Sequence, residues 1–358
     1  MQAPLVGNEV APAGGSLRIV VTGVTVGNLG LEGCRQLALS PEVAKLIITS
    51  RSEEKAKAAI AELVKVTGRD ASMFASLVVD WEDLASIKAA AAAMPDFDRL
   101  LLNAGGLAGL KKHLSGATHG QVINTLGHTV LVEDLLANGK LKEGAGQRVI
   151  YVGSEVSRTV LSFTGLLPNY FGYFAEKDLE SAISENYSTC PAIRQQLGDY
   201  KNAKIVGHMH FVNYAKEKPG IHWSTVSPGA VGASFAGVAF FPVKQLMATC
   251  PCIFYVMCVT HACGAEEAQQ IGAKRYVDVL TGEPKFPSGS MPMSPHDCCG
   301  LCFWGAKGKM VDNRPLVPYF RDESLHAATA VKVREYAAKW AAATPAGGAP
   351  TSSETMQR

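Results

Sequence analysis

Short runs of β-branched and apolar residues alternate with longer alanine-rich segments along most of the chain. The short runs predict strands at residues 17–22, 45–50, 74–79, 99–102, 148–152 and 221–226. The longer segments have a helical pattern and predict a helix ending near residue 39, then helices at 53–66, 83–94, 120–137, 200–217, 265–279 and 324–342. Strands that alternate with helices pair in parallel through right-handed crossovers. The pattern therefore predicts a single doubly wound α/β domain with a mostly parallel sheet and helices on both faces.

The alternation stops at residues 156–197, which are rich in Gly, Pro, Tyr and Ser. They predict an insertion ahead of the helix at 200–217. The two ends also differ from the rest: residues 1–16 are rich in Pro, Gly and Ala, and residues 344–358 in Pro, Gly, Ser and Thr. Such composition is typical of a flexible lead-in and a disordered tail. We expect the domain to span residues 17–343.

Residues 235–263 are strongly apolar and include an uncharged run, 246–259, that Pro251 interrupts. Apolar runs of about 10–14 residues are core or interfacial segments more often than membrane spans. We expect this region, with Phe240 and Phe241, to form a lid over an apolar substrate. Plain core packing is the alternative.

Composition and charge narrow the function. The 358 residues are 47% hydrophobic with a formal net charge of +2, so there is ample core and no basic field that would attract nucleic acid. Five of the nine cysteines lie at Cys250, Cys252, Cys298, Cys299 and Cys302. We interpret them as reduced thiols in a reducing compartment such as the cytoplasm, not as the disulfides of a secreted protein. A thiolate metal site is the alternative, but no second Cys-x-x-Cys pair supports it and we expect no metal.

A glycine-rich turn follows the first expected strand and precedes a helix: Thr22-Gly-Val-Thr-Val-Gly-Asn-Leu-Gly30. Its glycines would let the backbone approach a pyrophosphate at the helix N-terminus, where free amides and the helix dipole favour an anion. An ordinary tight turn is the alternative, although the position after the first strand favours a dinucleotide. The expected cofactor contacts here are Thr22, Gly23, Gly27, Asn28, Leu29 and Gly30.

The second strand ends in Thr49-Ser-Arg-Ser52, where an acid would bind the 2′-hydroxyl of NAD and a cation would accommodate the 2′-phosphate of NADP. Because Arg51 offers a planar fork and no acid is present, the sequence predicts NADPH/NADP over NAD. A solvated cation at the helix start is the alternative. Asp80, beside Trp81, is expected to accept a hydrogen bond from adenine, since Asp83 is better placed to cap the next helix.

The segment Tyr200-Lys-Asn-Ala-Lys204 places Tyr200 and Lys204 one helical turn apart on one face. A tyrosine with an unperturbed pKa near 10 is a poor acid at neutral pH, and a close ammonium group would lower that pKa. A surface pair is the alternative.

Asn103-Ala104-Gly105 ends the fourth expected strand, where small residues would let the backbone pass close to the ribose and nicotinamide. His208 and His210, on the same helix as Tyr200, are two residues apart and cannot share a face as a pair of metal ligands. His128, on the helix expected at 120–137, is expected to cap or pack.

The order of these features resembles the short-chain dehydrogenase/reductase family. The resemblance covers residues 17–279 and is carried by the glycine-rich turn, Asn103-Ala-Gly105, Asn124, Ser154, Tyr200 with Lys204, and Pro228-Gly229. It implies a seven-stranded Rossmann-type sheet and further cofactor contacts at Pro228, Gly229 and Val231. It also implies Tyr200 as general acid, Lys204 as its activator and ribose anchor, Ser154 as donor to the substrate carbonyl, and Asn124 in a proton relay. These roles suit carbonyl reduction, in which the nicotinamide supplies hydride and Tyr200 protonates the alkoxide.

Within the family, residues 49–55 and 122–128 are similar to the branch of retinol dehydrogenases and protochlorophyllide reductases. Residues 149–154 and the long gap that follows them are similar to light-dependent protochlorophyllide reductases. This branch implies NADPH, a large apolar substrate, peripheral membrane contact, and a location in the cytoplasm or plastid stroma. The family as a whole implies a homo-oligomer.

Four positions depart from the family pattern. Leu29 stands where the third glycine is usual, so that Gly30 comes one residue late. Leu102 replaces an asparagine, and Ala233 replaces a threonine that normally contacts the carboxamide, a role that Ser234 could take. Val206 replaces a cysteine that is typical of protochlorophyllide reductases and argues against photochemical reduction.

We therefore expect an NADPH-dependent oxidoreductase that transfers hydride to a large apolar carbonyl or conjugated double bond. A catalytically silent dinucleotide-binding Rossmann subunit of an assembly is one alternative, favoured by the shifted glycine and by Ala233. A protochlorophyllide-type reductase is an alternative within the enzyme class. Retention of Tyr200, Lys204, Ser154 and Asn124 together favours an active enzyme, because a silent protein has no chemical reason to keep them.

Overall fold

The computed structural model describes residues 15–109, 112–158, 160–161, 168–169, 174–185, 192–229, 265–294 and 309–344. The expected lid with Phe240 and Phe241 lies outside these ranges, as do Val231, Ala233 and the clustered cysteines. None of the described helices is long and apolar enough to cross a membrane.

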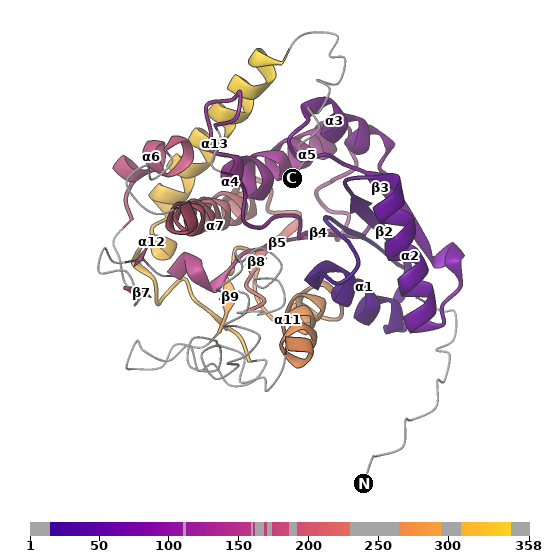
Figure 1. Ribbon diagram of the computed structural model, residues 1–358. Helices are drawn as coiled ribbons and strands as arrows, with labels where there is room; N and C mark the ends of the chain where they lie inside the picture. The colour runs from indigo at the N-terminus through magenta and orange to yellow at the C-terminus, as the bar shows by residue number, and fades with distance from the viewer. Residues whose placement is uncertain are drawn as a thin grey trace.

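A six-stranded parallel sheet forms the centre of the described structure (Figure 1), in the order β3-β2-β1-β4-β5-β8. The strands are β1 (Leu17–Val21), β2 (Val43–Ser50), β3 (Phe74–Val78), β4 (Arg99–Leu102), β5 (Arg148–Val152) and β8 (His222–Val226). β1 pairs with β2 on one side and β4 on the other, so the strand order reverses there. In open sheets of this kind, ligands bind outside the carboxyl ends of the strands at the point of reversal.

The seventh strand implied by the resemblance is not formed in the described part of the chain, although a segment runs beside β8 in its place. Thr225 N–H donates to the Ser290 carbonyl at 3.1 Å, and Ser227 N–H donates to the Pro292 carbonyl at 3.0 Å. Pro292, however, has no N–H to donate back to β8, which interrupts the ladder. The N–H of Met291 faces the opposite side and donates to the Asp312 carboxylate at 3.1 Å. The segment instead ends in a short antiparallel pair of β9 (Pro292–Met293) and β10 (Val311–Asp312).

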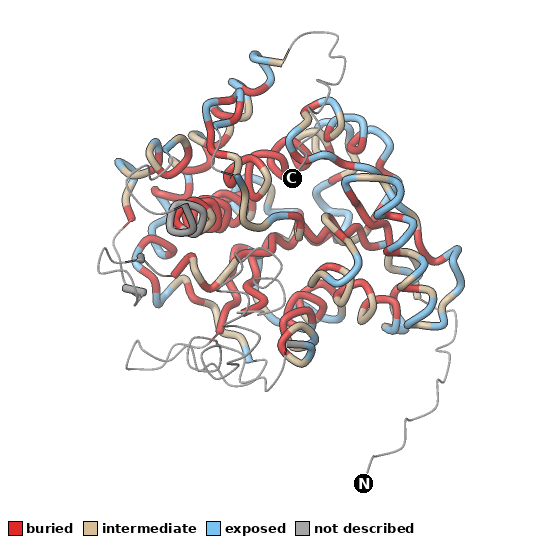
Figure 2. Tube along the Cα trace, viewed as in Figure 1, coloured by how far each residue is buried: buried red, intermediate tan, exposed pale blue. Residues whose placement is uncertain are grey.

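Helices cover both faces of the sheet (Figure 1). On one face lie α1 (Leu29–Leu39), α2 (Glu53–Thr67) and α11 (Ala265–Leu280). On the other lie α3 (Leu84–Ala93), α5 (Gly127–Ala137), α7 (Ala192–Glu217) and α13 (Glu323–Ala343). Because alternate residues of a strand face opposite sides, Val20 joins the second layer while Ile19 and Val21 join the first. Figure 2 shows the central strands and the inner sides of these helices as buried.

Two expected helices differ in detail. The helix expected at 120–137 is a short α4 (His119–Gln121), a π-helical turn (Val122–Leu126) and then α5. α7 begins at Ala192, well before residue 200, so the end of the expected insertion is helical. The sequence is compatible with this, because residues 192–197 hold no proline or glycine to break a helix.

The rest of the insertion is folded into short elements where it is described. They are 3-10 turns at Glu155–Arg158 and Glu176–Asp178, a pair of β6 (Val160–Leu161) with β7 (Pro168–Asn169), and α6 (Leu179–Ser184). Other short elements are a 3-10 turn at Ala71–Met73 before β3 and α12 (Pro318–Arg321) before α13.

Candidate active site

The glycine-rich turn between β1 and α1 packs tightly on its neighbours at two glycines and is open at the third. A side chain at Gly23, whose φ is +70°, would begin 2.5 Å from the Cα of Ala104. One at Gly30 would begin 2.6 Å from the Asn103 side-chain nitrogen. Gly27 has φ of +81° and nothing within 4 Å of the corresponding point. Gly23 and Gly30 thus allow close packing, and Gly27 leaves free space beside the helix N-terminus.

Asn28 caps α1 and closes the turn. Its Oδ1 accepts the N–H of Leu31 at 2.9 Å, and its Nδ2 donates to the Gly23 carbonyl at 2.8 Å. α1 begins at the next residue, so Leu29 is its first residue and Gly30 packs under the end of β4. The late glycine therefore still provides a close approach, only one residue further into the helix. The first amides of α1 have no partner within the helix and can bind an anion.

A cavity of about 710 Å³ lies at the carboxyl ends of the strands. It joins most of the residues that the sequence singles out: Gly23, Gly27, Asn28, Leu29, Gly30, Arg51, Asp80, Trp81, Asn103, Ala104, Gly105, Ser154, Tyr200, Lys204, Pro228 and Gly229. Thr22 and Asn124 are expected there but are not among the lining residues. Val231, Phe240 and Phe241 lie outside the described residues.

Thr22 is buried, and its hydroxyl is hydrogen-bonded inside the fold. Its Oγ1 accepts the N–H groups of Asn103 and Ala104 at 2.8 and 2.9 Å. Its own proton is thus directed to His128 Nε2 at 3.2 Å. Burial lowers the pKa of His128 to about 3, so the ring is neutral and its Nδ1–H faces the Asn124 carbonyl at 3.3 Å. His128 packs in the core, as expected.

Asn124 shapes the loop that follows β4. Its Oδ1 accepts the N–H of Gly106 at 3.0 Å, and its Nδ2 donates to the carbonyls of Gly106 and Gly120, both at 2.9 Å. A side chain at Gly105, where φ is +148°, would begin 2.4 Å from Asn124 Oδ1. The side chain of Asn124 therefore supports the backbone at the cavity wall and does not itself face the cavity.

Tyr200, Lys204 and Ser154 come together at the other end of the cavity. The Ser154 hydroxyl is hydrogen-bonded to the Tyr200 phenol. Lys204 Nζ donates to the Val152 carbonyl at 2.8 Å and lies 5.6 Å from the centre of the Tyr200 ring. Two consecutive turns of α7 thus meet the end of β5 and the residues just after it.

Burial has the largest effect on the pKa values of Tyr200 and Lys204. It raises the pKa of Tyr200 above its ordinary value, while the hydrogen bond from Ser154 acts in the opposite direction. It also lowers the pKa of Lys204 to about 7. The sequence led us to expect a lowered tyrosine pKa, and that is not what the protein alone provides, because Lys204 is buried and Tyr200 is partly buried. A bound anion in the cavity would favour the charged ammonium group.

Residues 18–165 match the family model for short chain dehydrogenase. The match supports membership of the short-chain dehydrogenase/reductase family. It covers the glycine-rich turn, Asn124 and Ser154, and stops before Tyr200. No curated protein matches the chain.

Solved structures share the fold of this family over most of the chain. An uncharacterized protein from Mycobacterium paratuberculosis is 16% identical with a TM-score of 0.60, over 92% of this chain and 96% of that chain. A short-chain dehydrogenase/reductase from Saccharomyces cerevisiae is 17% identical with a TM-score of 0.51, over 81% and 100%. Menthone neomenthol reductase from Mentha piperita is 18% identical with a TM-score of 0.50, over 77% and 98%. At these identities the likeness is one of fold.

His208 is a site residue that the sequence analysis missed. The N–H of Ser154 donates to His208 Nε2 at 3.3 Å, so the ring proton is on Nδ1, which donates to Thr225 Oγ1 at 2.6 Å. Burial lowers the pKa of His208 to about 3, which keeps this ring neutral. The available signal was spacing, because Tyr200, Lys204 and His208 follow one another at intervals of four. His210 faces elsewhere and contacts Thr129 Oγ1 at 3.0 Å.

The end of the cavity near β2 and β3 carries opposite charges. Arg51 is exposed there, and Asp83 caps α3 as expected, with its Oδ1 accepting the N–H of Ala85 at 2.9 Å. Asp80 is exposed and its Oδ1 accepts the N–H of Glu82 at 3.0 Å. Glu82, also missed from sequence, lines the cavity and forms an ion pair with His119. The hydrogen bond from His119 lowers the pKa of Glu82, with Arg51 among the smaller causes.

The residues present fit a dinucleotide. The free space at Gly27 and the start of α1 suit a pyrophosphate, and the small residues after β4 leave room beside Tyr200 and Lys204. Both groups of residues line the same cavity.

Proposed function

We propose that this protein is an NADPH-dependent oxidoreductase that reduces a large apolar carbonyl or conjugated double bond. One observation carries the proposal: Tyr200, Lys204 and Ser154 line the same cavity as the glycine-rich turn. A general acid, a cation beside it and a hydroxyl donor are the groups that carbonyl reduction requires.

The chemistry follows from this placement. A bound nicotinamide would supply the hydride to the carbonyl carbon. Ser154 would donate a hydrogen bond to the carbonyl oxygen, and Tyr200 would pass its phenolic proton to the same oxygen, which yields the alcohol. The Lys204 ammonium group would stabilise the resulting phenolate until a proton from solvent restores the phenol.

The preference for NADPH over NADH rests on Arg51. It lies at the cavity just after β2, where a 2′-phosphate is read in dinucleotide-binding folds. The nearby acid Glu82 is engaged by His119, so its presence does not remove the basis for a phosphate contact.

A catalytically silent dinucleotide-binding subunit is the second candidate. It is favoured by the state of Lys204, whose ammonium group is held by a backbone carbonyl and whose pKa falls to about 7. A neutral lysine would not stabilise a phenolate. The placement in the branch of retinol dehydrogenases and protochlorophyllide reductases, with its apolar substrate, likewise remains a proposal that rests on sequence.

The two candidates differ in turnover. We expect NADPH fluorescence to change on binding, and NADPH to be oxidised with one or more members of a panel of apolar aldehydes and ketones. Tyr200→Phe should keep NADPH binding and lower kcat by about 10²–10⁴-fold, the usual contribution of a general acid. Tyr336→Phe is the matched control, because that hydroxyl contacts Glu180 away from the cavity.

Binding of NADPH by the wild-type protein without turnover of any carbonyl would favour the silent subunit. Equal activity of Tyr200→Phe and wild type would remove the tyrosine from the mechanism.

A further inference from the structure

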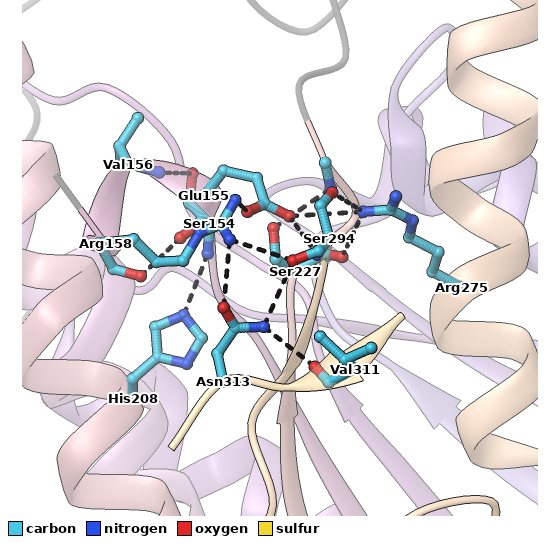
Figure 3. A network of polar contacts seen from close by, with 12 residues as sticks. Ser154, Glu155, Val156, Arg158, His208, Ser227, Arg275, Ser294, Val311 and Asn313 are labelled. Carbon is cyan, nitrogen blue, oxygen red and sulfur yellow. Dashed lines mark hydrogen bonds and ion pairs between the residues drawn. The ribbon is translucent and has the colours of Figure 1, made fainter. Parts of the chain in front are cut away.

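One acid and two arginines are buried together directly behind Ser154 (Figure 3). Glu155, Arg158 and Arg275 have exposed fractions of only 3%, 2% and 1%. Glu155 forms ion pairs with both arginines, with Arg275 Nη1 at 3.4 Å from its Oε1. Two cations share one carboxylate, so this cluster carries one surplus positive charge.

A surplus buried charge is costly, because a group removed from water without a full set of partners loses its hydration. Nε and Nη2 of Arg275 have no hydrogen-bond partner in the part of the chain that the structure describes. Arg158 has better contacts: only its Nε lacks a partner among the described residues, and its Nη1 donates to the Ser294 carbonyl at 3.0 Å and to Asn313 Oδ1 at 3.1 Å. Among the described residues, a full set of hydrogen bonds therefore does not account for the burial of Arg275.

The contacts of Arg275 suggest a different reason. Its Nη1 donates to Ser294 Oγ at 2.9 Å and to both Glu155 Oε1 and the Ser227 carbonyl at 3.4 Å. Glu155 directly follows Ser154, and Ser227 directly precedes the Pro228–Gly229 turn, which also lines the cavity. One guanidinium group thus joins two walls of the cavity that are distant in sequence (Figure 3).

The next residue on α11 connects the same helix to the glycine-rich turn. The Tyr276 hydroxyl donates to the Leu29 carbonyl at 2.5 Å, at the first residue of α1. Gly33 makes this contact possible, because a side chain there would begin 2.3 Å from the Tyr276 ring. Two consecutive residues of α11 therefore connect the cofactor end and the catalytic end of the site.

We propose that Arg275 is a positioning residue, retained because it holds the Ser154–Glu155 segment in register with the Pro228–Gly229 turn. The kinetic consequence rests on the proposed function. The structural consequence, order in these two segments, does not.

The test is Arg275→Met in the full chain, which leaves Glu155 and Arg158 as a one-to-one pair. We expect Tm to stay unchanged or rise, because the surplus buried charge is gone. Amide hydrogen exchange should speed up in peptides covering residues 152–158 and 225–229. The value of kcat should fall by about 10–100-fold with KM for NADPH changed by less than about threefold, as is typical of a misplaced catalytic group. Arg275→Lys should recover part of kcat.

Two controls separate positioning from charge. Arg158→Met also removes one buried cation but keeps the bond from Arg275 to Ser227, so its loss of kcat should be smaller. Lys274→Met changes an exposed neighbour on α11 that pairs with Asp278, and should leave exchange and kcat unchanged.

A fall in Tm and kcat for Arg275→Met that matches Arg158→Met would make Arg275 merely structural and overturn the proposal. Unchanged exchange at 152–158 and 225–229 would overturn it as well. If wild type binds NADPH but reduces no carbonyl, the proposed function fails, while faster exchange in Arg275→Met would still support the positioning role.

Discussion

Arg51 and Glu82 lie at one end of the cavity with opposite charges, so the specificity for the cofactor depends on which of them acts on the ribose. Glu82 is paired with His119, and Arg51 is exposed with its fork available to a phosphate. This arrangement argues for recognition by the cation.

We therefore expect Arg51→Ala to weaken NADPH binding by about tenfold or more, as loss of a charge-assisted hydrogen bond does. NADH, which lacks the phosphate, should be affected far less. Fluorescence titration of both nucleotides measures the difference. Lys55→Ala, an exposed cation in the first turn of α2, is the control. Equal weakening of NADPH and NADH by Arg51→Ala would show that the guanidinium group does not read the 2′-phosphate.

At the scale of elements, side chains of α7 contact the end of β5. Lys204 reaches the Val152 carbonyl, and His208 accepts the N–H of Ser154. Two glycines make the approach possible: a side chain at Gly207 would begin 2.3 Å from the Tyr151 hydroxyl, and one at Gly153 would begin 1.9 Å from His208 Nε2. The precision of the catalytic trio therefore depends on two residues that have no side chain.

Gly207→Ala should force α7 and β5 apart and lower the free energy of unfolding by about 1–3 kcal/mol, as overpacking does. Because Tyr200 and Lys204 are on the same helix, kcat should fall as well. Gly33→Ala, which would meet the Tyr276 ring at 2.3 Å between α1 and α11, offers a comparison with similar crowding elsewhere. Urea unfolding and steady-state kinetics measure both effects. A Gly207→Ala variant with wild-type stability would contradict the close approach of α7 to β5.

Over the whole molecule, burial leaves several histidines neutral. Burial lowers the pKa of His128, His208 and His210 to about 3 in each case, from an ordinary value of 6.5. Asp199 is the opposite case, since burial raises its pKa to about 6 from 3.8.

These shifts predict a loss of stability in acid. Between pH 6.5 and about 3, His128, His208 and His210 are protonated in the unfolded chain but stay neutral in the folded protein. The free energy of unfolding therefore falls as the pH falls through this window. Asp199 opposes the trend between pH 6 and 3.8, where the folded state binds the extra proton, and Asp134, whose pKa burial also raises, acts in the same direction. The histidines outnumber these two acids, because burial also lowers the pKa of His222 and His326 to about 4. Urea midpoints at a series of pH values measure the slope. His210→Gln should reduce the slope, and a midpoint independent of pH below 6.5 would contradict the prediction.

Much of the fold was predictable because it depends on local pattern. β4 and β5 have the expected bounds, and the other strands of the sheet differ by one or two residues at an end. The early start of α7 was missed because its first turns are polar and follow a segment rich in Gly, Pro, Tyr and Ser. The seventh strand is interrupted at Pro292, which has no N–H to donate to β8, and this local signal was present in the sequence.

The sequence by itself determined the alternation of strands and helices, the position of the glycine-rich turn, and the order of Ser154, Tyr200 and Lys204. These follow from periods of two and 3.6 residues and from the chain order, which every short segment carries locally. Only the tertiary structure decided which polar groups meet: Thr22 with His128, Ser154 with His208, and Glu155 with Arg275. It also decided their charge states, because the removal of water from Tyr200 and Lys204 depends on segments that are far apart in the chain.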